Sequence, residues 1–148
     1  ALKIARFKSG KYTIERPLHF GAALADPKNL TEILSIYSEF GLPLGEAFQM
    51  RDDLLGVFGN PIETGKPAGD DLREGKRTAL IAFTFDRVNK DEASKLSSLL
   101  GNPNLSQDEI EEAREIIESS GAKTHVEELI VKLQSENDQL KGKQDGHE

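Results

Sequence analysis

The chain has 148 residues, of which 36% are hydrophobic, and it carries a formal net charge of −7 with no cysteine. Its length fits one domain or part of one. The missing cysteines exclude disulfides, thiol catalysis and cysteine metal sites. No apolar run approaches the roughly 20 residues of a membrane-spanning helix. The acidic balance argues against nucleic acid as the main partner.

The chain begins with Ala1-Leu2-Lys3-Ile4-Ala5-Arg6-Phe7, without an initiating Met, a signal peptide or a helix cap. Apolar and basic residues already follow one another there as they do in the middle of a helix. We therefore expect this chain to be the C-terminal part of a longer protein.

The sequence predicts helices throughout and no strand, so the expected fold class is all-α. The expected helices are 11–25 interrupted at Pro17, 29–59 with a kink at Gly41 and Pro43, 77–89, 91–100, 107–119 and 122–140. In the second of these, the apolar face expected to be buried comprises Leu30, Ile33, Leu34, Ile36, Tyr37 and Phe40. Residues 60–76 read as a loop with at most one helical turn, and 141–148 as a disordered tail.

One segment combines an amide with two neighbouring carboxylates. On a helix, Gln49, Asp52, Asp53 and Gly56 share a face. Adjacent carboxylates repel each other unless a cation or hydrogen-bond donors satisfy them. Oxygen ligands of this kind suit Mg²⁺ shared with a phosphate. The alternative is that Asp52 and Asp53 are ordinary surface residues.

The segment 64–78 follows with two lysines, a further pair of aspartates and several glycines. Glycine lets the backbone approach a ligand closely, and lysine supplies point charges for a diphosphate. Such a loop suits a magnesium–diphosphate site, although a solvated surface turn would have a similar composition.

Together these segments resemble the trans-isoprenyl diphosphate synthases, the polyprenyl synthetase family, in their short-chain geranylgeranyl or farnesyl diphosphate synthase-like form. The stretch Phe48-Gln49-x-x-Asp52-Asp53-x-Leu55 is similar to that family's second aspartate-rich motif. At the family's spacing there follow Thr64-Gly65-Lys66, Gly69, Asp71, Lys76 and Thr78. Upstream, Lys8-Ser9-Gly10 resembles the family's Lys-Thr element, with Ser9 in place of Thr.

The resemblance covers residues 1–140 and implies the C-terminal part of the antiparallel helical bundle of the isoprenoid synthase fold. It implies metal binding by Asp52 with support from Asp53. Gln49 would lie beside the reacting carbons, and Phe48 would flank the homoallylic substrate.

The resemblance also assigns the cationic residues. Lys8 and Lys66 would hold the allylic diphosphate, and Ser9 would face the developing allylic cation. Lys76, also expected at the substrate, and Asp71 would help to close the loop over the site.

Two departures from the family pattern stand out. Gly56 occupies the place of a third Asp, which thins the outer carboxylate shell. No Asp-Asp-x-x-Asp followed by Arg-Arg, the family's first aspartate-rich motif, occurs in these 148 residues.

The expected function is a Mg²⁺-dependent prenyltransferase that condenses isopentenyl diphosphate with an allylic diphosphate to a longer prenyl diphosphate, such as geranylgeranyl diphosphate. The resemblance implies three Mg²⁺ ions in the full-length enzyme, an inactive fragment, a cytoplasmic location and a homodimer formed together with the missing N-terminal half. The alternative is a non-catalytic or regulatory subunit of a heteromeric synthase, towards which Gly56 points.

Overall fold

The computed structural model describes residues 3, 6–25 and 28–144. The chain divides into two compact units, and each is described by itself. Unit 1 contains Met50–Glu127, and unit 2 contains Leu2–Gln49 and Glu128–Glu148. The residues described form helices and turns without a strand, which confirms the expected all-α class.

Unit 2 begins with a π-helix, η1 (Arg6–Glu15), followed directly by α2 (Arg16–Ala25). The helix type changes next to Pro17, where the sequence predicted an interruption. Proline is tolerated in the first turn of a helix because the N–H groups there have no helical partner.

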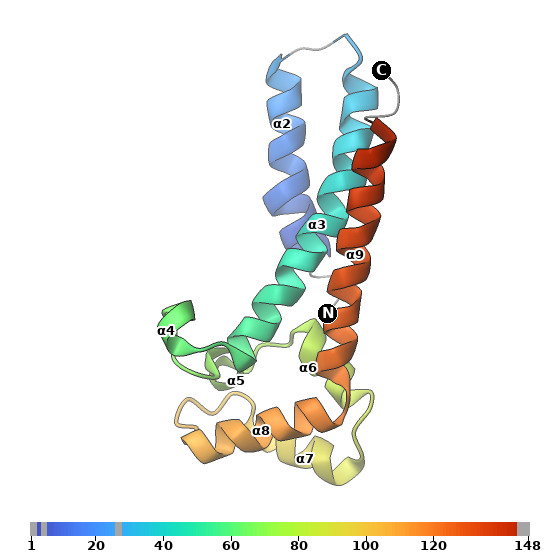
Figure 1. Ribbon diagram of the computed structural model, residues 1–148. Coiled ribbons are helices and arrows are strands. Elements are labelled where there is room, and N and C mark those ends of the chain that lie inside the picture. The colour runs from blue at the N-terminus through green and yellow to red at the C-terminus, as the bar shows by residue number, and fades with distance from the viewer. Residues whose placement is uncertain (1–2, 4–5, 26–27, 145–148) are drawn as a thin grey trace. The chain divides into compact units, whose positions relative to one another are not determined.

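The third helix, α3 (Leu30–Phe58), runs through Pro43 without a break (Figure 1). The kink that the sequence predicts at Gly41 and Pro43 therefore does not divide the helix. Gly41 lies in close contact with η1, since a Cβ there would be 3.3 Å from Ile14 Cγ2 and 3.5 Å from Glu15 Cα. This packing against η1 supports the helix where proline removes one hydrogen bond.

Polar side chains join α2 and η1 to α3 inside unit 2. Ser38 Oγ donates a hydrogen bond to the buried Glu15 carboxylate. His19 Nε2 lies 3.0 Å from both the Leu34 carbonyl oxygen and Ser38 Oγ. His19 is thus satisfied by neighbouring groups, as expected for a structural histidine.

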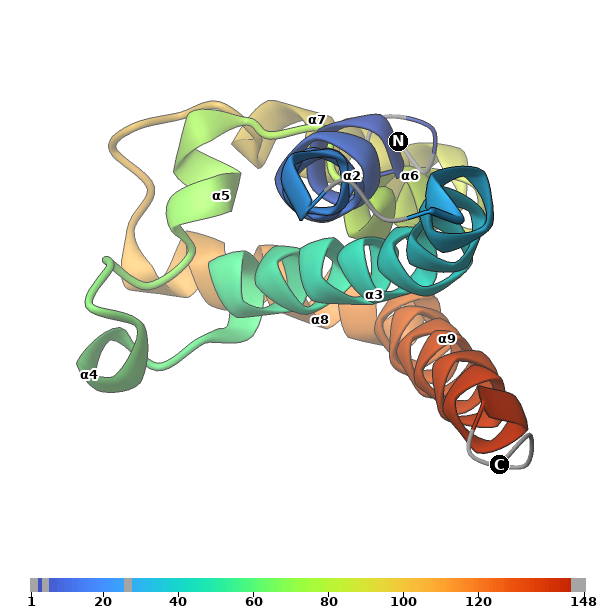
Figure 2. The ribbon, with the colours of Figure 1, turned by 90° about the horizontal axis from the view of Figure 1, so that it is seen from above.

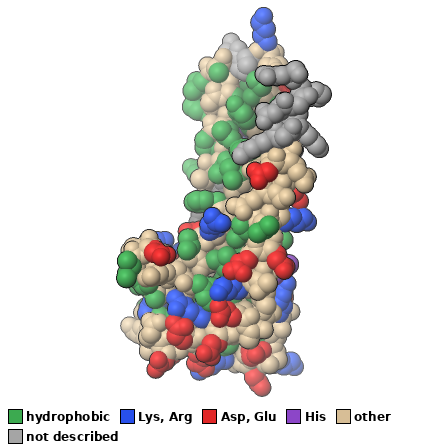
Figure 3. All heavy atoms as spheres, in the orientation of Figure 1, with side chains coloured by type: hydrophobic (Ala, Val, Ile, Leu, Met, Phe, Trp, Pro, Cys, Tyr) green, Lys and Arg blue, Asp and Glu red, His purple; other side chains and the backbone are tan. Residues whose placement is uncertain are grey.

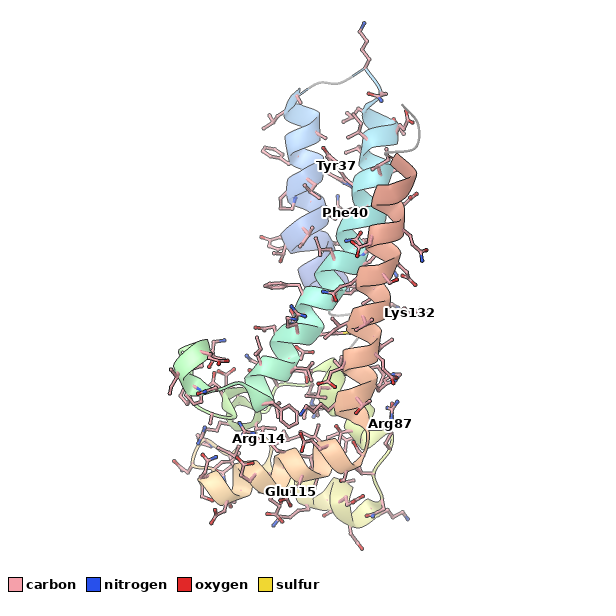
Figure 4. All side chains as sticks on the ribbon, in the orientation of Figure 1. Tyr37, Phe40, Arg87, Arg114, Glu115 and Lys132 are labelled. Carbon is pink, nitrogen blue, oxygen red and sulfur yellow. The ribbon has the colours of Figure 1, made fainter. Side chains whose placement is uncertain are left out.

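The apolar face that the sequence assigns to α3 is only half-buried in the structure. Tyr37 and Phe40, labelled in Figure 4, belong to this face. Tyr12, Phe20 and Leu24 of the same unit are exposed to 78%, 68% and 72%. Hydrophobic side chains are accordingly conspicuous on the α2 side in Figure 3.

Unit 1 holds five further helices in its described part: α4 (Pro61–Thr64), α5 (Asp70–Glu74), α6 (Ala79–Phe85), α7 (Lys90–Leu99) and α8 (Gln107–Ser119). Helices α7 and α8 lie side by side (Figure 1). In both ribbon views α4 projects beyond the other helices of this unit (Figures 1 and 2).

The segment 60–76 contains two short helices, so the expectation of a loop with at most one turn was wrong. Asn60 Oδ1 accepts a hydrogen bond from the Ile62 N–H and caps α4. Gly65 and Gly75 end α4 and α5 with φ values of 67° and 65°. Caps stabilise single turns that are too short to show apolar periodicity.

The core of unit 1 is formed by fully or almost fully buried side chains from α3, from α5 to α8 and from the segment that follows α8: Met50, Val57, Leu72, Leu80, Ile81, Leu96, Leu99, Ile110, Ile117 and Val126. Ser106 and Glu109 form a capping box at the start of α8, as their spacing in the sequence indicates. Asn89 and Glu92 form a second one at α7.

The last helix, α9 (Ala122–Gln144), continues beyond its expected end at 140, and residues 145–148 lie outside the described part of the chain. Among the described residues, no helix is both long and apolar enough to cross a membrane.

Candidate active site

Neighbouring carboxylates at the end of α3 have different environments. Asp52 is exposed and lines a cavity of about 330 Å³. Asp53 is 3% exposed, and its Oδ2 accepts a hydrogen bond from the Ala79 N–H at 3.2 Å. Ala79 is the first residue of α6, whose cap is Thr78. A carboxylate is stabilised by the free N–H groups at a helix start, so Asp53 anchors α6 and satisfies its own charge.

The cavity lies within unit 1, between the end of α3 and the segment with α4 and α5. Its walls are formed by Asp52, Leu55, Gly56, Glu63, Thr64, Lys66, Pro67, Asp70 and Asp71. The structure therefore brings together three residues selected from the sequence: Asp52, Lys66 and Asp71. Asp53 and Lys76 are not part of this wall.

The two lysines of the segment differ in their partners. Lys76 Nζ donates a hydrogen bond to Asp71 Oδ1 at 2.6 Å and lies 3.4 Å from Glu74 Oε2. The hydrogen bond to Asp71 is the main reason why the pKa of Lys76 lies above its ordinary value. Lys66 is exposed, and its ammonium group forms no ion pair with the described residues. Lys66 is therefore the lysine available to an anionic ligand.

Backbone contacts fix α5 in the cavity wall. The Gly101 N–H donates to the Leu72 carbonyl oxygen at 2.8 Å. A Cβ at Gly75 would lie 3.0 Å from Gly101 Cα, so both glycines permit this close approach. These contacts hold the helix that carries Asp71.

Arg73 was not selected from the sequence. Its guanidinium donates to the carbonyl oxygens of Ala68 and Leu105, the latter at 3.1 Å. It thereby ties the segment before α5 to the segment before α8. In the sequence, Arg73 stands close to Asp71 and Glu74 and therefore looks like an ordinary surface charge. The sequence alone does not reveal this role.

Arg114 of α8 holds the end of α3. Its Nε donates to the Val57 carbonyl oxygen at 2.8 Å, and its Nη1 lies 2.6 Å from Glu111 Oε1. Figure 4 shows Arg114 on the α3 side of α8, whereas Glu115 points away. The last carbonyl oxygens of a helix lack helical hydrogen-bond donors. The Arg114 guanidinium supplies such a donor to the last turn of α3, which follows the turn with Asp52.

A family model described as Polyprenyl synthetase matches residues 2–117 of the chain. The chain belongs to the polyprenyl synthetase family. It is 39% identical over 126 residues to a geranylfarnesyl diphosphate synthase from Aeropyrum pernix. The aligned region covers 85% of this chain and 37% of that protein. Over 86 residues, covering 58% of this chain and 26% of that protein, it is 42% identical to a geranylgeranyl diphosphate synthase from Saccharolobus solfataricus.

A solved geranylgeranyl pyrophosphate synthase from Corynebacterium glutamicum, complexed with isoprenyl diphosphate and magnesium, has the same fold. Its TM-score is 0.83 at 40% identity, over 93% of this chain and 40% of that chain. The chain thus spans well under half the length of these relatives.

The other residues selected through the family resemblance lie in unit 2. Phe48 is 64% exposed, and Gln49 is half-buried. The backbone of Lys8 and Ser9 forms part of η1, while their side chains lie outside what the structure describes.

An ion pair connects η1 to the same stretch of α3. Arg6 Nε lies 3.6 Å from Glu46 Oε1. Burial raises the pKa of Glu46, and Arg6 partly counteracts this. Glu46, which was not selected from the sequence, thereby links the turn before Gln49 to the start of η1.

The donor set of the cavity fits magnesium bound jointly with a diphosphate. Four carboxylates line it, but no three acidic or histidine side chains among the described residues are close enough to form a metal cage. Mg²⁺ commonly takes one or two carboxylates and fills its other positions with water and phosphate oxygens. Asp52, the exposed carboxylate on α3, is suited to such a shared ion.

Proposed function

We propose that the complete protein is a Mg²⁺-dependent trans-prenyltransferase that condenses isopentenyl diphosphate with an allylic diphosphate to a longer prenyl diphosphate, such as geranylgeranyl diphosphate. The observation that carries this proposal is that exposed Asp52 and Lys66, a lysine without an ion-pair partner among the described residues, line one cavity. A carboxylate beside a lysine suits a magnesium–diphosphate group. Membership of the polyprenyl synthetase family supports the same reaction class.

In this proposal the residues of the chain bind and orient the substrates. Asp52 holds a magnesium ion. Asp53 supports this site indirectly, through its hydrogen bond to the start of α6. Lys66 and Lys8 bind the allylic diphosphate, and Phe48 and Gln49 flank the hydrocarbon part.

Magnesium, when bound, supplies positive charge that stabilises the departing diphosphate. The Lys66 ammonium, which lines the same cavity, would supply further positive charge, and its attraction to the diphosphate would strengthen as the bond breaks. Ser9 offers an oxygen to the allylic cation. Leu55 and Pro67 are apolar parts of the cavity wall, and they limit the water that would quench this cation.

The test is prenyl transfer by the complete natural protein, measured with labelled isopentenyl diphosphate, farnesyl or geranyl diphosphate and Mg²⁺. Asp52→Ala should lower kcat by about 100-fold or more, since charge stabilisation in the transition state is lost. Glu127→Gln, an exposed change on α9, is the matched control. Near wild-type turnover by the Asp52 variant contradicts the assignment.

Gly56 favoured the alternative, a non-catalytic subunit of a heteromeric synthase, because it removes a family carboxylate. In the structure Gly56 lies against the carboxylate of Asp71, so the loss of an Asp at 56 does not leave this part of the wall without a carboxylate. Absence of turnover by the purified protein, with turnover restored by a second synthase subunit, would support the alternative.

We also propose that the complete protein acts in the cytoplasm as a homodimer. The exposed apolar residues of unit 2, Tyr12, Phe20 and Leu24, suit contact with further protein. Sedimentation of the complete protein tests the dimer, and cell fractionation tests the location.

A further inference from the structure

Gly56 of α3 and Asp71 of α5 occupy neighbouring space that cannot hold two side chains. A Cβ placed on Gly56 would lie 2.1 Å from Asp71 Oδ2, 2.2 Å from Cγ and 2.8 Å from Oδ1. These distances are far inside van der Waals contact. The Asp71 carboxylate thus fills the position that a side chain at residue 56 would take.

The Asp71 carboxylate is held firmly in this position. Asp71 is 5% exposed, and Lys76 Nζ donates to its Oδ1 at 2.6 Å. The backbone supports the same arrangement, since the Lys76 N–H donates to the Asp71 carbonyl oxygen at 3.1 Å. A buried carboxylate needs a cation or donors, and here Lys76 meets that need.

We propose that Gly56, Asp71 and Lys76 form one positioning unit of the cavity wall. The Asp71 carboxylate occupies the space that a side chain at residue 56 would fill. Lys76 is the counter-ion of Asp71 and not a free ligand of the diphosphate. As far as it concerns the diphosphate, this inference rests on the proposed function.

The unit ties the aspartate turn of α3 to α5. A side chain at 56 would displace the Asp71 carboxylate and with it the ammonium group of Lys76. Asp70, next to Asp71 on the same helix, also lines the cavity and would move as well. A substitution at 56 should therefore weaken ligand binding in the cavity, although Gly56 has no side chain to contact a ligand.

A double-mutant cycle in the complete natural protein tests the coupling. Gly56→Ala should lower Tm by about 4–8 °C without ligand, as overpacking does. In the Asp71→Ala background, which frees the space, Gly56→Ala should change Tm by no more than about 1 °C. Gly21→Ala is the matched control, because a Cβ there meets nothing within 4 Å and its φ is not positive.

Titration calorimetry with inorganic diphosphate and Mg²⁺ gives a second readout. Gly56→Ala should weaken binding about 10-fold, and Lys66→Met by at least as much. Lys76→Met should lower Tm in the wild-type background but neither Tm nor affinity in the Asp71→Ala background. A general loss of stability in the Lys76 variant would lower Tm whether or not Asp71 is present.

Additive Tm losses at positions 56 and 71, or an unchanged Tm for Gly56→Ala, would overturn the proposal. If Gly56→Ala does not fold, the double variant of Gly56→Ala with Asp71→Ala decides. A double variant that folds supports the proposal, and one that does not fold overturns the proposal. If Lys76→Met weakens diphosphate binding as much in the Asp71→Ala background as in the wild type, Lys76 is a direct ligand. That result would overturn its role as counter-ion. A wild-type protein that lacks magnesium–diphosphate binding refutes the proposed function, while the Tm cycle still decides on the coupling.

Discussion

The Asp53 carboxylate accepts a hydrogen bond from the Ala79 N–H over 3.2 Å and so joins the end of α3 to the start of α6. Asp52, its neighbour in sequence, lines the cavity. Successive helical residues point about 100° apart, so one Asp-Asp pair can serve two surfaces. This geometry favours a division in which Asp52 acts on the ligand and Asp53 on the fold.

Substitution of the pair should separate stability from activity. Asp53→Ala should lower the free energy of unfolding by about 1–3 kcal/mol, because a buried N–H loses its acceptor. Asp53→Asn keeps an acceptor oxygen and should cost less. Asp52→Ala should change stability by no more than about 0.5 kcal/mol. Urea unfolding of the complete protein measures all three, and equal losses at 52 and 53 would contradict the division.

Arg114 should contribute to stability mainly through its bond to the Val57 carbonyl oxygen. Arg114→Met keeps much of the packing but removes this donor, and it should cost about 1–3 kcal/mol in free energy of unfolding. Glu111→Gln removes only a half-exposed ion-pair partner and should cost less than about 1 kcal/mol. A larger loss for the Glu111 variant in urea unfolding would assign the effect to the ion pair.

The pKa of Lys76 predicts how stability depends on pH. Because Asp71 raises this pKa above 10.5, the folded protein holds the Lys76 proton more tightly than the unfolded chain does. The contribution is therefore complete below the unfolded pKa and is lost as pH rises through the folded one. As the pH rises above about 10, urea unfolding should show a smaller loss of stability in Asp71→Asn than in wild type. Parallel curves would contradict this linkage.

The sequence predicted the helices with clear periodicity or caps, and it did so for a local reason. Ser106 and Glu109 lie within one turn, so their capping box is readable from spacing alone, and α8 has the expected bounds. Residues 60–76 were harder, since α4 is a single turn too short to show apolar periodicity and α5 depends on tertiary anchors such as the bond from Arg73 to the Leu105 carbonyl oxygen.

The family pattern selected Asp52, Lys66 and Asp71, which the cavity unites. It gave Asp53 a supporting role at the metal but could not show its hydrogen bond with the Ala79 N–H, because Ala79 is remote in sequence. It also showed Gly56 only as a missing Asp. The reason for glycine there is the carboxylate of Asp71, whose position depends on how α5 packs.

The 148 residues alone should not catalyse prenyl transfer. They contain no Asp-Asp-x-x-Asp, so only one of the two carboxylate walls expected around the diphosphate is present. The check is turnover of labelled isopentenyl and farnesyl diphosphates by the 148-residue chain, purified free of longer chains. Robust turnover would show that one wall suffices.

The same chain should also not persist as a free monomer. In unit 2, Tyr12, Phe20 and Leu24 are exposed to 78%, 68% and 72%. Each apolar side chain of this size gains about 1.5–3 kcal/mol on full burial, so together they favour association. Sedimentation should therefore show oligomers or aggregates, and Tyr12→Ser with Phe20→Ser should shift the distribution towards the monomer. A compact monomer with a cooperative melt, insensitive to these changes, would mean that the exposed apolar face of unit 2 needs no partner.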